Sequence, residues 1–317
     1  MTPPAIEVEN LRKVYSSAFG RRKITALERV DISVPQGEVF GLLGPNGAGK
    51  TTMVKILLDL TRPTEGTARI LGVPVSRAVS RRRVGYLPEG HRFPGYLTAR
   101  ETLSIFGRMS GLDGAALRAR IPLMLERVHL SPWAEVRVKK FSKGMTQRLG
   151  LAAAMIHDPL VLLLDEPTDG VDPVGRREIR DLLKAEAREG KAIFLNSHLL
   201  SEIELTCDRV AVLRKGYVAA TGRIEDLTRR EPRYRMVSDP MDERLVASFL
   251  ETGAGVERSN GHLLLTVRDV EHLNALIDRA RTTGVSLHEV TPVRSTLEDV
   301  FVDLIRTDDP GAEVGAS

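Results

Sequence analysis

Short apolar runs alternate with segments of helical spacing along the first two thirds of the chain. Apolar residues recur at helical intervals from Thr51 to a stop near residues 62–63, and again across residues 97–136 and 176–188. Strands are predicted over residues 6–14, 26–34, 39–43, 160–164 and 192–195, and a hairpin over 209–213 and 217–220. Strands that alternate with helices predict an α/β fold with a mostly parallel sheet covered on both faces.

The pattern changes after Gly222, which we take as the end of a first domain spanning residues 5–222. Residues 226–240 are charged and contain proline, and strand-like, helical and strand-like segments follow at 262–267, 270–281 and 285–290. We therefore predict a small α+β C-terminal domain over residues 223–305. The polar, glycine-containing tail at 306–317 is predicted to be disordered.

Composition is that of an ordinary globular protein, with 42% hydrophobic and 28% charged residues. No apolar run approaches the roughly 20 residues that span a bilayer, and the first ten residues lack the apolar core of a signal peptide. A single cysteine, Cys207, excludes an internal disulfide. We expect a soluble protein in the reducing cytoplasm.

The charge balance permits an anionic partner without requiring one. There are 46 Lys and Arg residues against 42 Asp and Glu residues, a net charge of +4. The densest basic run, at residues 77–83, is interrupted by apolar residues, and aromatics make up only 4% of the chain. No nucleic-acid partner is expected.

The residues between the third apolar run and the following helix match the phosphate-binding pattern GxxxxGK[ST]. Glycines let the backbone curl so that several N–H groups and a helix N-terminus point at phosphate oxygens. A lysine at the β- and γ-phosphates, acting in catalysis as well as binding, and a threonine hydroxyl facing Mg²⁺ complete such a site. We predict an ATP site made of Gly44, Pro45, Asn46, Gly47, Ala48, Gly49, Lys50, Thr51 and Thr52.

The buried run at residues 160–164 ends in two acids, Asp165 and Glu166. An acid at the carboxyl end of a strand lies where open α/β sheets bind ligands. Asp165 is predicted to hold Mg²⁺ through water, and Glu166 to orient or deprotonate the attacking water. Such a pair alone could simply cap the next element, but beside a phosphate loop it predicts ATP hydrolysis.

Residues 141–148 read Phe-Ser-Lys-Gly-Met-Thr-Gln-Arg, and this segment resembles the signature of ATP-binding cassette proteins, usually written LSGGQ. Other family motifs are matched in order by Tyr15, by residues 85–89, by residues 165–173 and by residues 196–198. The resemblance covers about residues 5–222, and the ordered set is far more specific than any single motif.

The resemblance implies a P-loop NTPase core with an antiparallel β subdomain and a helical subdomain at about residues 90–140. It implies that Tyr15 stacks on adenine, that the catalytic His198 contacts the γ-phosphate, and that Asp172 lies in the loop that contacts a partner subunit. It also implies a head-to-tail dimer, most simply of two copies of this chain. Each ATP would then be shared with the other subunit's Ser142, Lys143, Gly144 and Met145.

Structural roles remain open for several of these residues. Ser142 could serve as the N-cap of an amphipathic helix, a role compatible with phosphate contact. His198 could be a structural histidine and Tyr15 a core aromatic.

The sequence departs from the family pattern at three positions. Lys143 replaces a signature glycine, and Met145 replaces glutamine. Glu89 stands where the family usually has glutamine, and its carboxylate would bind Mg²⁺ more strongly than an amide. We predict that Glu89 is a ligand of Mg²⁺ and that phosphate contact through Ser142 and Gly144 is retained.

Near the end of the chain, residues 295–301 resemble those of ATPase subunits from bacterial exporters of drugs, lipids or polysaccharides. Ser295 and Glu298 also form a candidate capping box. The resemblance implies a separate transmembrane permease that contacts residues 93–109, and a location at the cytoplasmic face of the membrane.

Two other classes of cassette ATPase compete with the exporter interpretation. A ribosome-acting ATPase normally carries two cassettes, and a second phosphate loop is absent from this sequence. A DNA-repair ATPase needs a long coiled coil, for which residues 52–141 are too short and irregular. A non-catalytic ATP sensor would be expected to lack Glu166.

Overall fold

The computed structural model describes residues 3–16, 23–228, 232–239, 243–259, 261–293 and 295–306. The chain divides into two compact units, one running to Ile224 and including the residues from Phe301, the other spanning Glu225–Val300. The first unit therefore extends two residues past the predicted boundary, and it also includes the end of the last helix. Of the tail predicted at 306–317, Arg306 is the last residue of helix α10 (Leu297–Arg306), and residues 307–317 lie outside the described residues.

The first unit is built on a six-stranded sheet of order β10-β9-β3-β8-β7-β6. The five strands from β9 to β6 are parallel, and β10 pairs antiparallel with β9 as the predicted hairpin. The strands are β3 (Val39–Leu43), β6 (Val84–Leu87), β7 (Val161–Asp165), β8 (Ala192–Asn196), β9 (Arg209–Arg214) and β10 (Tyr217–Arg223). Every residue of β3, β7 and β8 is buried, which is why each is a short, continuous apolar run.

A second, antiparallel sheet of order β2-β1-β4-β5 shares a hydrophobic core with the parallel sheet. Its strands are β1 (Ile6–Ser16), β2 (Lys23–Val34), β4 (Glu65–Ile70) and β5 (Val73–Pro74). The apolar pattern predicts β1 and β2 but misses β4, because only two of its six residues are buried. The mostly parallel core sheet and the antiparallel subdomain are confirmed.

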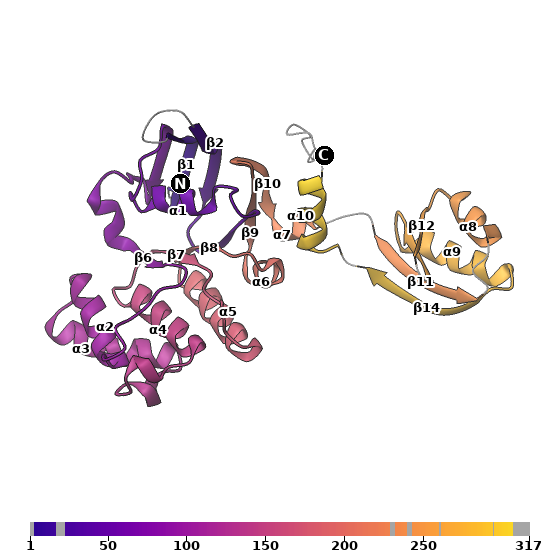
Figure 1. The fold of residues 1–317 in the computed structure, drawn as a ribbon. Coiled ribbons are helices and arrows are strands. Elements are labelled where there is room, and N and C mark those ends of the chain that lie inside the picture. The colour runs from indigo at the N-terminus through magenta and orange to yellow at the C-terminus, as the bar shows by residue number, and fades with distance from the viewer. Residues whose placement is uncertain are drawn as a thin grey trace. The chain divides into compact units, whose positions relative to one another are not determined.

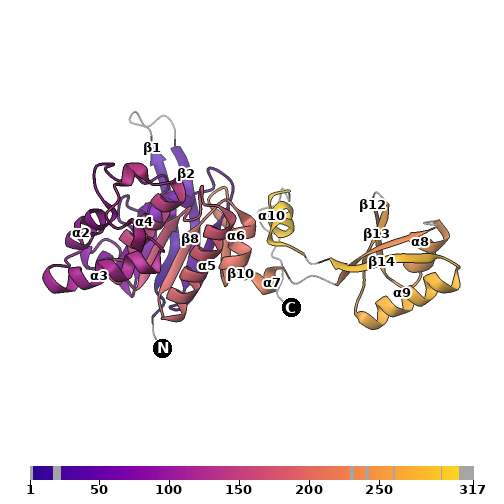
Figure 2. The same cartoon turned by 90° about the horizontal axis from the view of Figure 1, so that it is seen from below.

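Helices α2, α3 and α4 pack together in a group at one side of the unit (Figures 1 and 2). The helices of the unit are α1 (Lys50–Leu57), α2 (Ala99–Met109), α3 (Gly114–Arg127), α4 (Lys143–Met155), α5 (Pro173–Arg188) and α6 (Leu200–Thr206), with α7 (Ile224–Leu227) at the junction. Short 3₁₀ turns are η1 (Ala78–Arg83), η2 (Ser131–Trp133) and η3 (Val138–Lys140). The described helices include none that is both long and apolar enough to cross a membrane.

Local chemistry explains where α1 and α2 end or begin. Thr98 and Glu101 form a capping box that starts α2. Helix α1 ends at Leu57, short of the stop predicted near residues 62–63. Asp59 takes a positive φ of 57°, and the N–H of Leu60 turns back to the Lys55 carbonyl, 2.8 Å away.

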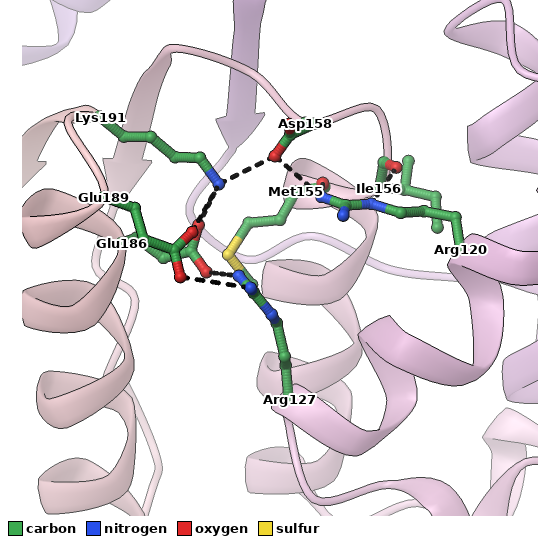
Figure 3. Close-up of polar contacts among 8 residues, drawn as sticks. All are labelled: Arg120, Arg127, Met155, Ile156, Asp158, Glu186, Glu189 and Lys191. Carbon is green, nitrogen blue, oxygen red and sulfur yellow. Dashed lines mark hydrogen bonds and ion pairs between the residues drawn. The ribbon is translucent and has the colours of Figure 1, made fainter. Parts of the chain in front are cut away.

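Charged side chains join α3 to the far ends of α4 and α5 (Figure 3). Arg120 donates to the Ile156 carbonyl at the end of α4 (Nε to O, 3.1 Å) and pairs with Asp158 (Nη2 to Oδ1, 3.0 Å). Lys191 Nζ lies 3.0 Å from the same Asp158 oxygen and also pairs with Glu186 of α5. Burial raises the pKa of Asp158, but its two cationic partners hold it below its usual value.

Glu186 is the deepest member of this network. Its side chain is 1% exposed and is shared by Lys191, which is 6% exposed, and by Arg127 at the end of α3. Arg127 also reaches the exposed Glu189 (Nη2 to Oε1, 3.3 Å). The group of α2, α3 and α4 is therefore tied to the loops that precede β7 and β8 by a chain of alternating charges.

The second unit has its own core between helices α8 and α9 and one face of a four-stranded antiparallel sheet, β12-β13-β11-β14. Its elements are β11 (Arg233–Asp239), α8 (Glu243–Leu250), β12 (Gly255–Ser259), β13 (His262–Thr266), α9 (Val270–Thr282), β14 (Ser286–Val293) and the start of α10 (Leu297–Arg306), a helix that continues from Phe301 as part of the first unit. The α+β class predicted for this region is confirmed. The sequence pattern missed β11, α8 and β12, since polar residues interrupt their apolar positions.

The capping box predicted at Ser295 and Glu298 is wrong by one residue. Helix α10 starts at Leu297, so that Thr296 and Asp299 cap it reciprocally: Thr296 N donates to Asp299 Oδ2 (2.8 Å) and Asp299 N to Thr296 Oγ1 (3.2 Å). This register buries Leu297 and Val300. In its last turn, the Leu304 carbonyl accepts from Arg214 Nη1 at 2.9 Å, which binds the helix end to β9.

Candidate functional site

Four adjacent parallel strands end at one edge of the six-stranded sheet, and the predicted site residues lie at or just after these ends. Register pairs Leu42 of β3 with Asn196 of β8, and Asn196 with Asp165 of β7, while Leu87 of β6 pairs with Leu164. The phosphate loop, the acid pair, the 196–198 segment and Glu89 therefore all follow carboxyl ends of adjacent strands. This is the edge at which open α/β sheets bind ligands.

The phosphate loop has the backbone that its glycines predict. Gly44 and Gly49 take positive φ values of 153° and 114°, and a Cβ at either would come within 2.4 Å of a backbone oxygen. Lys50 folds over the loop and donates Nζ to the Gly44 carbonyl (2.6 Å) and the Pro45 carbonyl (3.2 Å). Burial lowers the pKa of Lys50, and the negative charges of Glu166, Asp165 and Glu89 oppose that shift.

The rest of the loop leaves room for an anion. Asn46, Gly47 and Thr51 are exposed, and no acidic residue occupies the first turn of α1. The free N–H groups at the start of α1 carry partial positive charge. This end of the helix, together with Lys50, is suited to polyphosphate.

Asp165 is buried and accepts a hydrogen bond from Asn196 (Nδ2 to Oδ1, 2.6 Å). Burial raises the pKa of Asp165 to about 6; the carboxylates of Glu89 and Glu166 add to the shift, while Asn196 and Lys50 oppose it. The Oδ1 atom of Asn196 is itself buried and has no hydrogen-bond partner among the described residues. Oxygen donors with an excess of negative charge fit Mg²⁺.

The oxygen donors at this edge suit Mg²⁺ that is bound together with phosphate groups. Among the described residues, no three His, Cys, Asp or Glu side chains cluster so as to hold a metal ion by themselves. Mg²⁺ usually keeps several waters and takes only one or two protein oxygens together with phosphates. Asp165 and the neighbouring Thr51 and Glu89 are consistent with that mode.

Glu166 adopts a left-handed backbone conformation (φ 51°) that turns its buried side chain toward the segment after β8. Its carboxylate accepts from Ser197 Oγ (3.0 Å) and from the His198 N–H (2.8 Å). His198 Nδ1 lies 2.7 Å from the same oxygen, Oε1, while its side chain is 62% exposed. The structure thus brings two of the three predicted catalytic residues, Glu166 and His198, into direct contact.

The signature segment begins α4, as the N-cap alternative predicts. Ser142 Oγ accepts a hydrogen bond from Met145 N at 3.2 Å, and the first turn of α4 contains no acidic residue. Lys143 pairs with Asp169 (Nζ to Oδ2, 2.8 Å). Asp172 caps α5 by accepting from Gly175 N at 2.7 Å, so the structure gives it a local role.

A cavity of about 390 Å³ opens beside this segment. It is lined by the signature residues 142–145 and Arg148, by residues 170–172 and by residues 129, 130 and 133. A polar hollow at a helix N-terminus can accept part of another molecule.

Three residues in the site have roles that the sequence did not reveal. Gln147 is buried and donates Nε2 to the Glu166 carbonyl at 2.9 Å. His91 Nε2 lies 3.1 Å from the Thr146 carbonyl and so ties the segment after Glu89 to α4. Ser197 orients Glu166. Gln147 and Ser197 lie within the motifs at residues 141–148 and 196–198, so the sequence indicated them indirectly. His91 lies in no such motif.

Tyr15 and Glu89 stand at the margins of this arrangement. Tyr15 is 38% exposed, with Lys13 Nζ 4.9 Å from its ring centroid, so it is not a core aromatic. Glu89 is exposed, yet its charge acts on both Lys50 and Asp165. Adenine stacking by Tyr15 and metal binding by Glu89 stay predictions.

Replacing Glu89 with Gln is expected to retain nucleotide binding near neutral pH and to alter turnover. The change removes a negative charge that raises the pKa of Asp165. Because protons and Mg²⁺ compete for Asp165, Mg-nucleotide affinity of the parent should fall as the pH drops through about 6. In Glu89→Gln the fall should occur at lower pH, as measured by fluorescent-nucleotide titration with Glu135→Gln as the control. An unchanged midpoint with unchanged turnover contradicts this role.

Comparisons with known proteins agree with this geometry. The ABC transporter family profile matches residues 27–169. An ABC transporter ATP-binding protein of Synechocystis sp. is 35% identical over 310 residues, covering 95% of this chain and 84% of the relative. The Nod factor export ATP-binding protein I of Ralstonia nicotianae is 36% identical over 321 residues, covering 95% and 94%.

Solved structures show the same fold. An ATP-binding subunit of an ABC transporter matches with a TM-score of 0.63 and 30% identity, over 70% of this chain and 91% of that one. The dimeric ATP-binding cassette MJ0796, in a post-hydrolysis state with ADP and Pi, matches with a TM-score of 0.61 and 26% identity, over 69% and 98%. The chain therefore belongs to the ABC transporter ATP-binding proteins, whose nucleotide-binding domain is an ATPase.

Proposed function

We propose that this chain is the ATPase subunit of an exporter, in which two copies close on two ATP molecules and drive a separate membrane permease. The observation that carries the proposal is the meeting of phosphate loop, acid pair and His198 at one sheet edge, in a chain that also presents a capped signature helix. Two relatives named Nod factor export ATP-binding protein I align over 95% of the chain, a share too large to leave out its C-terminal unit.

Within one subunit, the chain's own groups bind and activate the reactants. Lys50 would leave the Gly44 and Pro45 carbonyls for the β- and γ-phosphate oxygens. Glu166, oriented by Ser197 and His198, would accept the proton of the attacking water at its carboxylate. Mg²⁺, held by Thr51, Asp165 and Glu89, would neutralise charge on the phosphates.

The second half of each site would come from the other copy. The start of α4, with Ser142 as its cap and the adjoining cavity, offers N–H groups and positive charge to a γ-phosphate. A single copy lacks that half of the electrostatic clamp for its own nucleotide. Hydrolysis is therefore expected to depend on dimerisation. Asp172 would lie near the dimer interface.

The permease would contact the start and the outer face of α2. Tyr96 precedes the helix and is 72% exposed, while Ile105 (42%) and Met109 (78%) lie one turn apart on it. Exposed apolar side chains grouped in this way mark interaction surfaces more often than chance positions. Such docking would hold the subunit at the cytoplasmic face of the membrane.

Affinity purification from detergent-solubilised membranes, followed by mass spectrometry, tests the proposal. We expect a multi-span permease to co-purify with the parent and to be depleted with Met109→Glu, because a charge would be buried in the contact. Leu60→Glu, at an exposed apolar residue after α1, is the matched control and should retain the permease. Recovery of ribosomal or DNA-repair proteins alone would overturn the exporter assignment.

A further inference from the structure

The contact of Lys143 with Asp169 joins the two segments that would face the partner subunit. Lys143 is the first residue of α4, and Asp169 lies in the loop between β7 and α5, three residues after Glu166. Their charged atoms are 2.8 Å apart. The contact exists because lysine stands where the family pattern has glycine.

The ion pair between Lys143 and Asp169 contributes little to the stability of the fold. The two side chains are 63% and 46% exposed, and exposed ion pairs contribute little net stability. The stem of Lys143 lies across Gly170: a Cβ at Gly170 would come within 2.1 Å of Lys143 Cδ. The stem of Lys143 therefore packs against Gly170, and both residues line the cavity.

Positive charge near Asp169 comes from more than Lys143. The nearby charges of Lys143, His198 and Arg176 together lower the pKa of Asp169 and keep it ionised. Breaking the pair thus leaves an exposed carboxylate on which the positive charge of Arg176 still acts. A phosphate group brings more negative charge than Asp169 does, and three strong acceptor oxygens.

We propose that Lys143 is an exchanging positioning residue: it pairs with Asp169 while no nucleotide faces α4, and transfers to the triphosphate of the partner subunit when the dimer closes. The inference rests on the proposed ATP-sandwich dimer. Asp169 competes with the nucleotide for the Lys143 ammonium group, and this competition opposes closure of the dimer. Asp169 also adjoins the subunit's own active site, because its N–H donates to the Glu166 carbonyl at 3.1 Å.

The exchange predicts opposite effects for the two halves of one ion pair. In a full-length Glu166→Gln background that preserves ATP, Lys143→Met should raise the ATP-dependent dimer dissociation constant about tenfold. Asp169→Asn should lower it, by about threefold, because Lys143 is then free for phosphate. Lys143→Arg should remain close to the parent. Sedimentation velocity across protein concentrations measures all of these constants.

Two controls separate the exchange from loss of structure or of general charge. Lys140→Met removes an equal charge from an exposed lysine nearby and should leave the dimer constant close to that of the parent. MgADP affinity, which reports each subunit's own loop, should be unchanged in all variants. If Lys143→Met and Asp169→Asn shift dimerisation in the same direction, or either has no effect, the pair is a fixed latch and the exchange is wrong. If the background protein itself fails to dimerise with ATP, the proposed function fails first.

Discussion

Glu166→Gln should bind Mg-ATP and accumulate as a dimer while losing turnover by about 10²–10⁴-fold, the usual contribution of a positioned general base. The amide is nearly the same shape as the carboxylate: its one carbonyl oxygen can still accept from the His198 N–H, and its NH₂ group can donate to Ser197 Oγ. It cannot take the proton of water. It also removes a negative charge beside the γ-phosphate, which favours the bound state. Phosphate release under saturating Mg-ATP and light scattering after gel filtration measure the two effects.

The control for this variant is Glu189→Gln, which makes the same chemical change at the far end of α5, where the side chain is 51% exposed. It should hydrolyse ATP at the parental rate. Turnover of Glu166→Gln within a few-fold of the parent would show that another group activates water. His198, which shares the Oε1 oxygen of Glu166, would then be the next candidate.

Glu186→Gln is expected to lower the free energy of unfolding of the first unit by about 3–5 kcal/mol, the cost of removing one partner from a buried ion pair. Glu186 is 1% exposed and neutralises two cations, Lys191 and Arg127. Lys191 is almost as deeply buried, so its charge would be left with only the exposed Asp158 and the more distant Glu189. The network in Figure 3 would lose its centre.

The chain has one tryptophan, Trp133, and it lies in the first unit next to α3. Its fluorescence during urea denaturation therefore follows the unit in which the network lies. Glu189→Gln is again the matched control, because this exposed glutamate meets the same Arg127 and should cost about 0–1 kcal/mol. Equal midpoints for the two variants would mean that the buried pair contributes no more than the exposed one.

Much of the candidate site could be predicted because its chemistry is contiguous in the chain. The phosphate loop needs glycines, Lys50 and Thr51 in one turn between a strand and a helix, and all of them occur within residues 44–52. Likewise, β3, β7 and β8 are buried on both faces, so each is a continuous apolar run visible without a structure. Among the strands that the pattern did not predict, β4 and β11 have polar residues at most positions.

Which strands are neighbours could not be deduced from those runs. The strand order β10-β9-β3-β8-β7-β6 brings Asn196 to Asp165, and His198 to Glu166, across 31 and 32 residues of sequence. Packing of α4 on the same edge brings Gln147 to the Glu166 carbonyl. The one-residue shift of the α10 cap has a similar origin, since burial of Leu297 and Val300 outweighs the local preference for Ser295.

The amino-acid sequence by itself determined the nucleotide chemistry of this protein, because backbone curl, lysine charge and paired acids are properties of short segments. Only the tertiary structure decided which groups act on one another: His198 on Glu166, Lys143 on Asp169, and Arg127 and Lys191 on Glu186. The physical reason is that charges and hydrogen bonds depend on distances of a few ångströms, and those distances arise from strand order and helix packing between residues far apart in the chain.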